Sequence, residues 1–248
     1  MTEFSYQLYS SREFPPLEKT LEMLKRHGYA QVEGYGGVYT DVEATKSALD
    51  ANGLTMPSGH FSIDLLESDP QKVIDIAGTL GIKAIYCPHL AADQRPADAA
   101  GWTAFGQRLE AAYKVYSKAG FTFGWHNHDF EFVALPDGSI PQKLIFDAAP
   151  SIFWEADIAW IIRGGGDPFE WIKNYGARIG AVHIKDIAPS GENANEDGWA
   201  DVGQGTVDWQ ALLNALKTTP VSYLIMEHDR PADDERFARR SIEAVRAF

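Results

Sequence analysis

The sequence predicts an α/β protein that folds as a single (β/α)8 barrel, on three observations. Its 248 residues suit one such barrel, which takes about 250 residues. Short apolar or β-branched segments alternate with longer segments of helical period, as in repeated β-α units with a parallel sheet. Eight segments of each kind follow one another without a linker. We therefore expect residues 1–248 to form one domain.

The strand segments are short, as expected for buried parallel strands. They cover residues 4–9, 30–34, 55–61, 84–89, 121–128, 152–159, 179–185 and 222–228. The helical segments cover residues 16–27, 41–51, 70–80, 97–118, 142–148, 168–175, 209–216 and 233–248. Proline after an acidic cap marks helix starts at Asp69-Pro70 and Asp167-Pro168. A doubly wound open sheet is the alternative, but residues 7–12, QLYSSR, lack the glycine-rich phosphate loop it would need.

The composition restricts the partners of the chain. A formal net charge of −13 disfavours nucleic acid, because binding to phosphates needs clustered Lys and Arg. The single cysteine, Cys87, excludes an internal disulfide. There is no basic, apolar N-terminal signal and no apolar run of about 20 residues. These features predict a cytoplasmic protein with a small-molecule partner and no membrane contact, with homo-oligomerisation left open.

Most of the histidines lie at the ends of predicted strands. Six of the seven lie at or near the C-terminal end of a predicted strand, and barrel active sites are built at that face. These six are His60, His89, His126, His128, His183 and His228. The seventh, His27, ends the first helical segment, where a cation suits the helix dipole.

Carboxylates and a lysine join the histidines. Glu155 and Asp157 share one face of their strand by its two-residue period, as His183 and Lys185 do on the next strand. Glu227 follows an apolar run, where an unpaired carboxylate is unfavourable to bury, and is therefore a predicted metal ligand. A His, Asp and Glu set without a thiolate suits one divalent ion, Mn, Co, Zn or Mg, with positions left for substrate oxygens.

Motifs at four strand ends carry a resemblance to a known family. They are HNH at residues 126–128, Glu-x-Asp-x-x-Trp at 155–160, Val-His-x-Lys-Asp at 182–186 and Met-Glu at 226–227, with Gly-Gln-Gly at 203–205. With them the chain resembles the xylose-isomerase-like TIM barrel superfamily of sugar phosphate isomerases and epimerases. The resemblance implies one divalent ion held by His126 or a neighbour, Asp157, His183 and Glu227.

The strand-five motif departs from the pattern of the superfamily. Many members read Glu-Asn-His where this chain reads His126-Asn127-His128, so His128 and Glu131 are alternative ligands. Without that glutamate, epimerisation by two bases that act on opposite faces of the sugar is less well supported. The type-two apurinic endonucleases of the superfamily are also similar, with zinc histidines at the positions of His60 and His89. Trp160 and Trp199 replace two further zinc histidines, which argues against DNA repair.

The resemblance implies a sugar isomerase or epimerase acting on a keto-sugar or hydroxy-ketone through a metal-bound enediolate. Glu155 is the expected base, with Glu227 and Lys185 as further catalytic residues. The expected substrate-binding residues are His60, His89, His128, Trp160 and Trp199. Trp125 either stacks on the sugar or lies in the core, and Glu33 either joins the site or forms only a salt bridge. Lys185 could instead pair with Asp186 or Glu155.

Two other functions fit the same residues. The metal-enediolate chemistry could expel a leaving group, as in a lyase or dehydratase acting on a keto-inositol or 3-keto-glycoside. A non-catalytic sugar-binding protein or a metal-dependent hydrolase is less favoured. No basic phosphate cradle stands out in the sequence, which favours an unphosphorylated sugar.

Overall fold

The computed structural model describes residues 3–248, in which eight parallel strands close into a barrel. This confirms the predicted fold class. Around the barrel the strand order is β1-β10-β7-β6-β5-β4-β3-β2. The strands are β1 (Phe4–Gln7), β2 (Gln31–Gly34), β3 (Thr55–His60), β4 (Ala84–Cys87), β5 (Thr122–His126), β6 (Phe153–Asp157), β7 (Ile179–Ile184) and β10 (Tyr223–Met226). Because β1 pairs with both β2 and β10, the barrel leaves no free edge.

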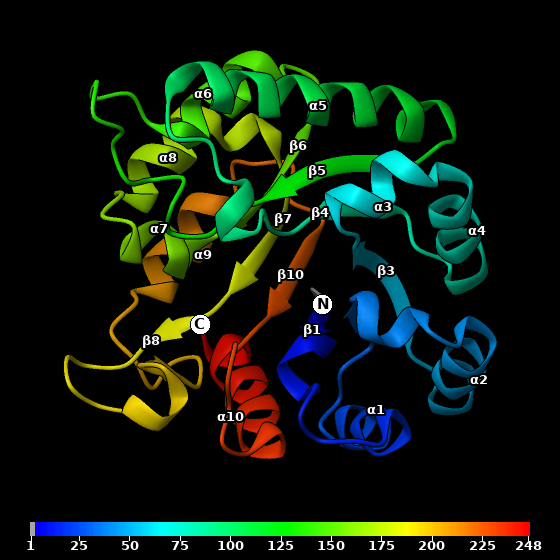
Figure 1. Cartoon of the computed structure of the whole chain (residues 1–248). Coiled ribbons are helices and arrows are strands. Elements are labelled where there is room, and N and C mark those ends of the chain that lie inside the picture. Colours follow the sequence, from blue (N-terminus) through cyan, green and yellow to red (C-terminus); the bar gives the residue numbers. More distant parts are fainter. Residues whose placement is uncertain (1–2) are drawn as a thin grey trace.

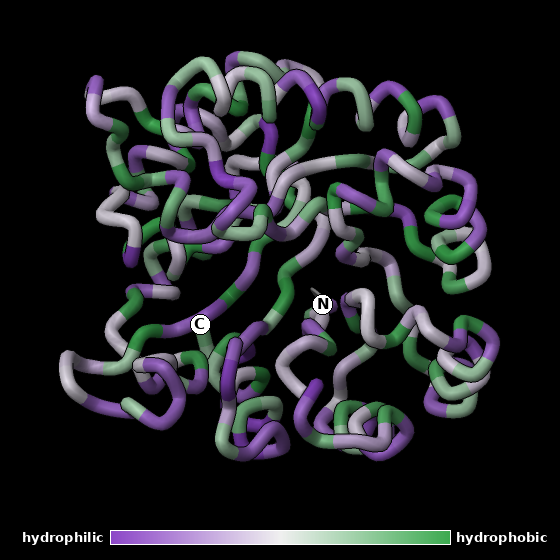
Figure 2. The backbone as a smooth tube through the Cα atoms, viewed as in Figure 1, coloured by the Kyte–Doolittle hydropathy of each residue, from purple (hydrophilic) through white to green (hydrophobic). Residues whose placement is uncertain are grey.

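The helices surround the barrel, and the last one lies beside the first where the barrel closes (Figure 1). They are α1 (Leu17–Arg26), α2 (Val42–Asn52), α3 (Ile63–Ser68), α4 (Pro70–Leu80), α5 (Ala99–Lys118), α6 (Pro141–Ala148), α7 (Ile158–Arg163), α8 (Pro168–Tyr175), α9 (Trp209–Leu216) and α10 (Asp234–Ala247). Figure 2 shows hydrophobic and hydrophilic stretches alternating along them, as in helices that bury one face. None of the helices within residues 3–248 could span a membrane, because none is both long and apolar enough.

Local capping explains where the structure departs from the predicted elements. The strand predicted for residues 152–159 ends at Asp157, because the Asp157 side chain accepts a hydrogen bond from Trp160 N and starts α7. Ser62 caps α3 in the same way. Neither helix was predicted, and most strands end one or two residues before the predicted boundary. Aspartates likewise cap α2, α4, α5, α8, α9 and α10.

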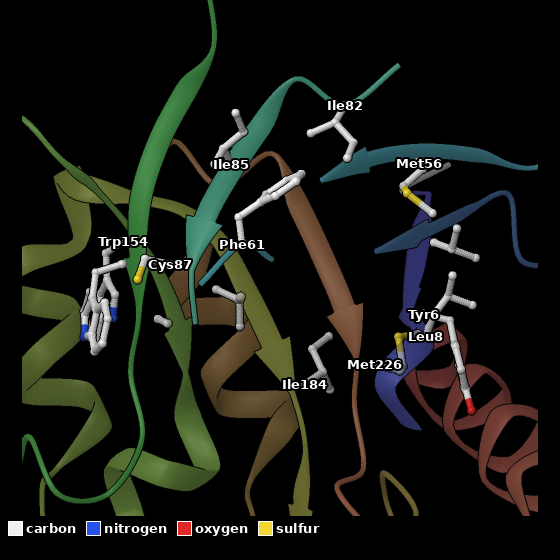
Figure 3. Close-up of a cluster of buried hydrophobic side chains, with 14 of the residues drawn as sticks. Tyr6, Leu8, Met56, Phe61, Ile82, Ile85, Cys87, Trp154, Ile184 and Met226 are labelled. Carbon is white, nitrogen blue, oxygen red and sulfur yellow. The ribbon is translucent and has the colours of Figure 1, made fainter. Parts of the chain in front are cut away.

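Side chains on the outer face of the strands form the main core with the helices. Tyr6 extends from β1 towards α10 (Figure 3), where its ring centroid lies 5.6 Å from that of Phe237. Cys87 and Trp154 are fully buried in the same cluster. Trp125 also lies here, with its ring centroid 5.1 Å from that of Phe105. The core alternative for Trp125 is therefore the correct one.

The Tyr86 side chain packs inside the barrel against Gly124 of β5 and Gly180 of β7. Its ring requires two glycines, because a Cβ on Gly124 would lie 2.8 Å from Tyr86 Cε1 and one on Gly180 would lie 2.7 Å from Tyr86 Oη. The cavity of the barrel opens at its C-terminal end.

The segment between β7 and β10 forms one wall above that end. It contains a short antiparallel pair that the sequence did not predict, β8 (Asp186–Ile187) and β9 (Trp199–Ala200). The Asp186 carboxylate accepts backbone hydrogen bonds from Ile187, Gly203, Gly205 and Val207. These bonds hold the Gly203-Gln-Gly205 turn against the strand end, and a Cβ on Gly205 would collide with that carboxylate.

Candidate active site

A cavity of about 870 Å³ opens at the C-terminal ends of the barrel strands. Each barrel strand or the loop that follows it contributes at least one residue to the lining. These include Tyr9, Tyr35, His60, His89, His126, Trp160, Trp199 and Glu227. Of the predicted substrate-binding residues, His60, His89, His128, Trp160 and Trp199 all lie in this lining.

Four residues from four strand ends converge beside the cavity. His126, Asp157, His183 and Glu227 are all buried, and their candidate ligand atoms lie within 4.8 Å of one another. They are the four residues predicted as metal ligands. The two other candidates for the strand-five ligand do not belong to this group. His128 lines the cavity and packs against Phe130, and Glu131 accepts hydrogen bonds from Trp125 Nε1 and His128 N.

Two of these four residues have a buried atom that could bind a divalent ion. His126 Nδ1 and Asp157 Oδ2 have no hydrogen-bond partner within residues 3–248, although Glu155 Oε2 lies 3.1 Å from His126 Nδ1 and Lys185 Nζ lies 3.1 Å from Asp157 Oδ2. Burial, followed by the charge of His183, lowers the pKa of His126 well below its usual value, so its imidazole is in the neutral form that coordinates metals. Buried polar atoms without partners are unfavourable, and a bound cation would satisfy them.

A second group of four shares two of these residues. His60, His126, Glu155 and His183 also bring candidate ligand atoms within 4.8 Å of one another. In this group His60 Nε2 and Glu155 Oε2 already form a hydrogen bond of 2.6 Å. Glu155 and His183 are fully buried and do not line the cavity, whereas His60 and His126 do.

Glu33, from β2, pairs with two of the histidines. Its Oε2 lies 2.7 Å from His183 Nε2 and 3.1 Å from His60 Nε2, and Gln7 Nε2 donates to it at 2.8 Å. Burial would raise the pKa of Glu33, but the charges of His60 and His183 outweigh this and lower it. Burial alone would lower the pKa of His60, and the charges of Glu33 and Glu155 raise it to about 10. Glu33 therefore belongs to the site.

Lys185 holds three carboxylates together beneath the cavity. Its Nζ lies 2.8 Å from Glu227 Oε2, 3.0 Å from Asp229 Oδ2 and 3.1 Å from Asp157 Oδ2. Burial would lower the pKa of Lys185, but these charges raise it above its usual value, so the ammonium form is maintained. The alternative expectation of a salt bridge to Asp186 or Glu155 is wrong, because the ammonium group lies among these other carboxylates.

Two tryptophans and an arginine form the wall above this charge cluster. The ring centroids of Trp160 and Trp199 lie 4.7 Å apart at 82°. Arg163 Cζ lies 3.2 Å from the Trp199 ring centroid, and its Nη2 donates to Asp197 O at 2.8 Å. This stack attaches α7 to the loop between β7 and β10.

The structure also shows which residues the sequence reasoning misplaced or missed. His228 lies at a strand end as predicted, but it faces Phe237 and Glu196 outside the cavity. Asp229, which lines the cavity, was not predicted. It lies two residues after Glu227, so the same period-two argument could have identified it. Arg163 had no such signal.

A closed parallel barrel with polar residues at the C-terminal ends of its strands is the architecture of TIM-barrel enzymes. The chain belongs to the xylose isomerase-like TIM barrel family, whose model matches residues 21–248. Among curated proteins, the rhizopine catabolism protein MocC of Rhizobium meliloti is 24% identical over 261 residues, covering 87% of this chain and 75% of that protein.

Solved structures show the same fold. A sugar phosphate isomerase/epimerase from Parabacteroides distasonis has a TM-score of 0.83 at 20% identity, with 99% of this chain and 94% of that chain covered. The probable 3-DHS dehydratase AsbF of Bacillus anthracis has a TM-score of 0.78 at 13% identity, covering 99% of both chains. IOLI protein, solved with a zinc atom, has a TM-score of 0.75 at 17% identity and covers 98% and 96%.

Proposed function

We propose that this chain is a divalent-metal-dependent isomerase or epimerase of a keto-sugar or related hydroxy-ketone. The convergence of His126, Asp157, His183 and Glu227 beside the cavity carries the proposal. Each group of four has two members in the cavity lining and one internal hydrogen bond. We assign the ion to the first group because its four residues are those that the resemblance to the family implied as ligands.

A divalent ion held there would supply a Lewis acid for the negative charge that develops on substrate oxygens when a proton leaves the neighbouring carbon. The other requirement is a proton carrier that reaches the carbon. Glu227 lines the cavity, and its Oε2 is held by His183 at 2.8 Å and by Lys185 at 2.8 Å. We assign Glu227 the transfer of a proton at one face of the substrate.

Glu155 and Lys185 act through their neighbours in this proposal. Glu155 is fully buried and bonded to His60, so we assign it the positioning of the His60 ring, which lines the cavity. Lys185 holds the carboxylates of Glu227 and Asp229 and balances their charge. His89 and His128 contact each other in the lining and would bind substrate hydroxyls, while Trp160 and Trp199 would pack on the sugar ring.

A lyase or dehydratase is the second candidate, and the position of Asp229 favours it. Glu227 and Asp229 follow the same strand and both line the cavity, so one could remove a proton and the other protonate a leaving group from the same side. The fold that the chain shares with a probable dehydratase is compatible with this outcome.

Metal analysis tests the proposal first. The purified protein should contain about one divalent ion per chain after Mn, Co or Zn is added, and Asp157→Ala and His183→Ala should each lose it. Asp137→Ala, an exposed loop aspartate, is the matched control and should retain it. No ion in the wild type, or retention in both site variants, would contradict the proposal.

The reaction is then assigned with keto-sugars in heavy water. Exchange of one carbon-bound hydrogen without loss of water or aglycone would support the isomerase or epimerase. Stoichiometric release of a leaving group would replace it with the lyase. Glu227→Gln should abolish either reaction.

A further inference from the structure

The cavity has two walls of different chemistry. The side built after β5, β6, β7 and β10 carries His126, His128, Glu227, Asp229 and the two tryptophans. The side built after the first four strands carries His60, His89, Arg12 and Asp64, but most of its other residues are apolar, and we call these apolar residues the apolar wall. It consists of Tyr9, Tyr35, Phe61, Ile63, Leu65 and Pro88.

The aromatic residues of the apolar wall are held in place before any ligand binds. The rings of Tyr9 and Tyr35 meet edge to face, with centroids 5.4 Å apart at 83°. Arg12 Cζ lies 4.0 Å from the Tyr9 ring centroid, and Arg12 Nη1 donates to the Tyr9 and Asp229 carbonyls. Phe61 stacks on Tyr39 with centroids 4.7 Å apart. A preformed aromatic surface binds with little loss of side-chain freedom.

The cavity also has more room than one sugar ring requires. Its volume of about 870 Å³ lies near the upper end of the roughly 300–1,000 Å³ typical of sites for drug-sized ligands. Tyr9 remains 38% exposed within it. Phe61 and Ile63 of the apolar wall are buried, whereas Tyr35, Leu65 and Pro88 are half-buried. A sugar placed against Glu227 and the tryptophans would leave Tyr9, Tyr35 and Leu65 in contact with water, and exposed apolar surface of this kind marks a binding site.

The charges of the rim do not favour a phosphate on the substrate. Among the described residues that line the cavity, the two arginines are Arg12 and Arg163. Both donate to backbone carbonyls and stack on aromatic rings. Asp64, Asp197 and Asp229 lie in the same lining and would repel an anion.

We propose that the substrate is an unphosphorylated glycoside with an aromatic aglycone, and that the apolar wall is the aglycone subsite. This rests on the proposed function, because the sugar ring is placed at the metal side of the cavity. The aglycone then lies against Tyr9, Tyr35 and Leu65, where edge-to-face contacts between aromatic rings are favourable.

Calorimetric titration tests the proposal with stable probes, namely phenyl and methyl D-glucopyranosides in both anomeric forms, and glucose 6-phosphate. At least one of the two phenyl anomers should bind the metal-loaded wild type about tenfold more tightly than the methyl glycoside of the same anomeric form, because the phenyl glycoside buries an additional apolar ring. Tyr35→Ser and Leu65→Asn should each remove most of that ratio. Phe169→Ser, an exposed aromatic outside the cavity, is the control and should preserve it.

Equal affinities for phenyl and methyl glycosides, a preference for glucose 6-phosphate, or a phenyl preference that survives both wall variants would overturn the proposal. A dimer that excludes the phenyl glycoside would assign the wall to a second copy of the chain and overturn it as well. The phenyl-to-methyl ratio should persist in Asp157→Ala, which removes the metal side alone. Failure of the proposed reaction is therefore distinguishable from failure of the aglycone subsite.

Discussion

His183 is held between two carboxylates that lie on opposite sides of its ring. Its Nδ1 lies 2.8 Å from Glu227 Oε2, and its Nε2 lies 2.7 Å from Glu33 Oε2. The two glutamates come from β2 and from the end of β10, while His183 lies on β7. A carboxylate on the far nitrogen of a metal-binding histidine fixes the ring orientation and increases its basicity.

Glu33→Gln should therefore weaken metal binding without removing a proposed ligand. We expect the dissociation constant for Mn or Zn to rise about 10- to 100-fold, the range for loss of such an outer partner. Competition with a fluorescent chelator measures it, with exposed Glu22→Gln as the matched control. Wild-type affinity in Glu33→Gln would show that the Glu33 contact has only a structural role.

Lys185→Met should destabilise the metal-free protein strongly. The change leaves the buried Asp157 and Glu227 and the half-buried Asp229 without their shared cation. Breaking a buried ion pair in this way typically costs about 3–5 kcal/mol, which urea unfolding in EDTA would measure. Because a divalent ion replaces part of the lost positive charge, added Mn should restore more stability to this variant than to the wild type. The exposed pair partner Lys46, changed to Met, should show neither effect.

Glu131 should make the protein less stable as the pH rises towards 8. Burial raises the pKa of Glu131 to about 8, against about 4.3 in an unfolded chain. Between these values the folded state holds a proton that the unfolded state has lost, so the free energy of unfolding falls with rising pH, by at most about 1.4 kcal/mol per pH unit. Glu131→Gln lacks this titration. Urea unfolding of both proteins from pH 5 to 8.5 should give profiles that diverge; parallel profiles would contradict the shifted pKa.

Arg163→Ala should weaken sugar binding with a smaller effect on turnover. The arginine stacks on Trp199 and donates to Asp197 O, so its loss loosens one wall of the cavity and leaves the proposed ligands in place. A loss of about 1 kcal/mol corresponds to a roughly fivefold higher KM or Kd. Steady-state kinetics and calorimetry would separate KM from kcat. The control is Arg239→Ala, which breaks an exposed pair with Glu243. A fall of kcat in Arg163→Ala as large as the rise of KM would contradict a role confined to binding.

The sequence predicted the barrel and the strands from which the site is built. The strand segments alternate with helical ones at a regular spacing, and Asp69 and Asp167 cap helices where the sequence indicated. Of the two alternatives for Trp125, stacking on the sugar and packing in the core, the structure shows the core. The short helices α3 and α7 were missed, because a capping side chain within a presumed strand or loop redirects the chain over only a few residues.

The choice among the strand-five candidates needed the three-dimensional arrangement. The sequence favoured His126 and left His128 and Glu131 as alternatives, and His126 alone of the three belongs to the two groups of converging ligand atoms. Glu155 shares a strand face with Asp157, as predicted, but it is bonded to His60 and lies outside the cavity lining.

By itself, the sequence determined the fold class and the residue types at the strand ends, because periodicity and capping act between near neighbours along the chain. The tertiary structure alone decided that Glu33 supports His183, that Lys185 joins three carboxylates and that Tyr9, Tyr35 and Leu65 share a cavity wall. Such contacts depend on the register between strands far apart in sequence. In a closed barrel a shift of one residue would turn Glu33 of β2 or His183 of β7 to the opposite face of its strand.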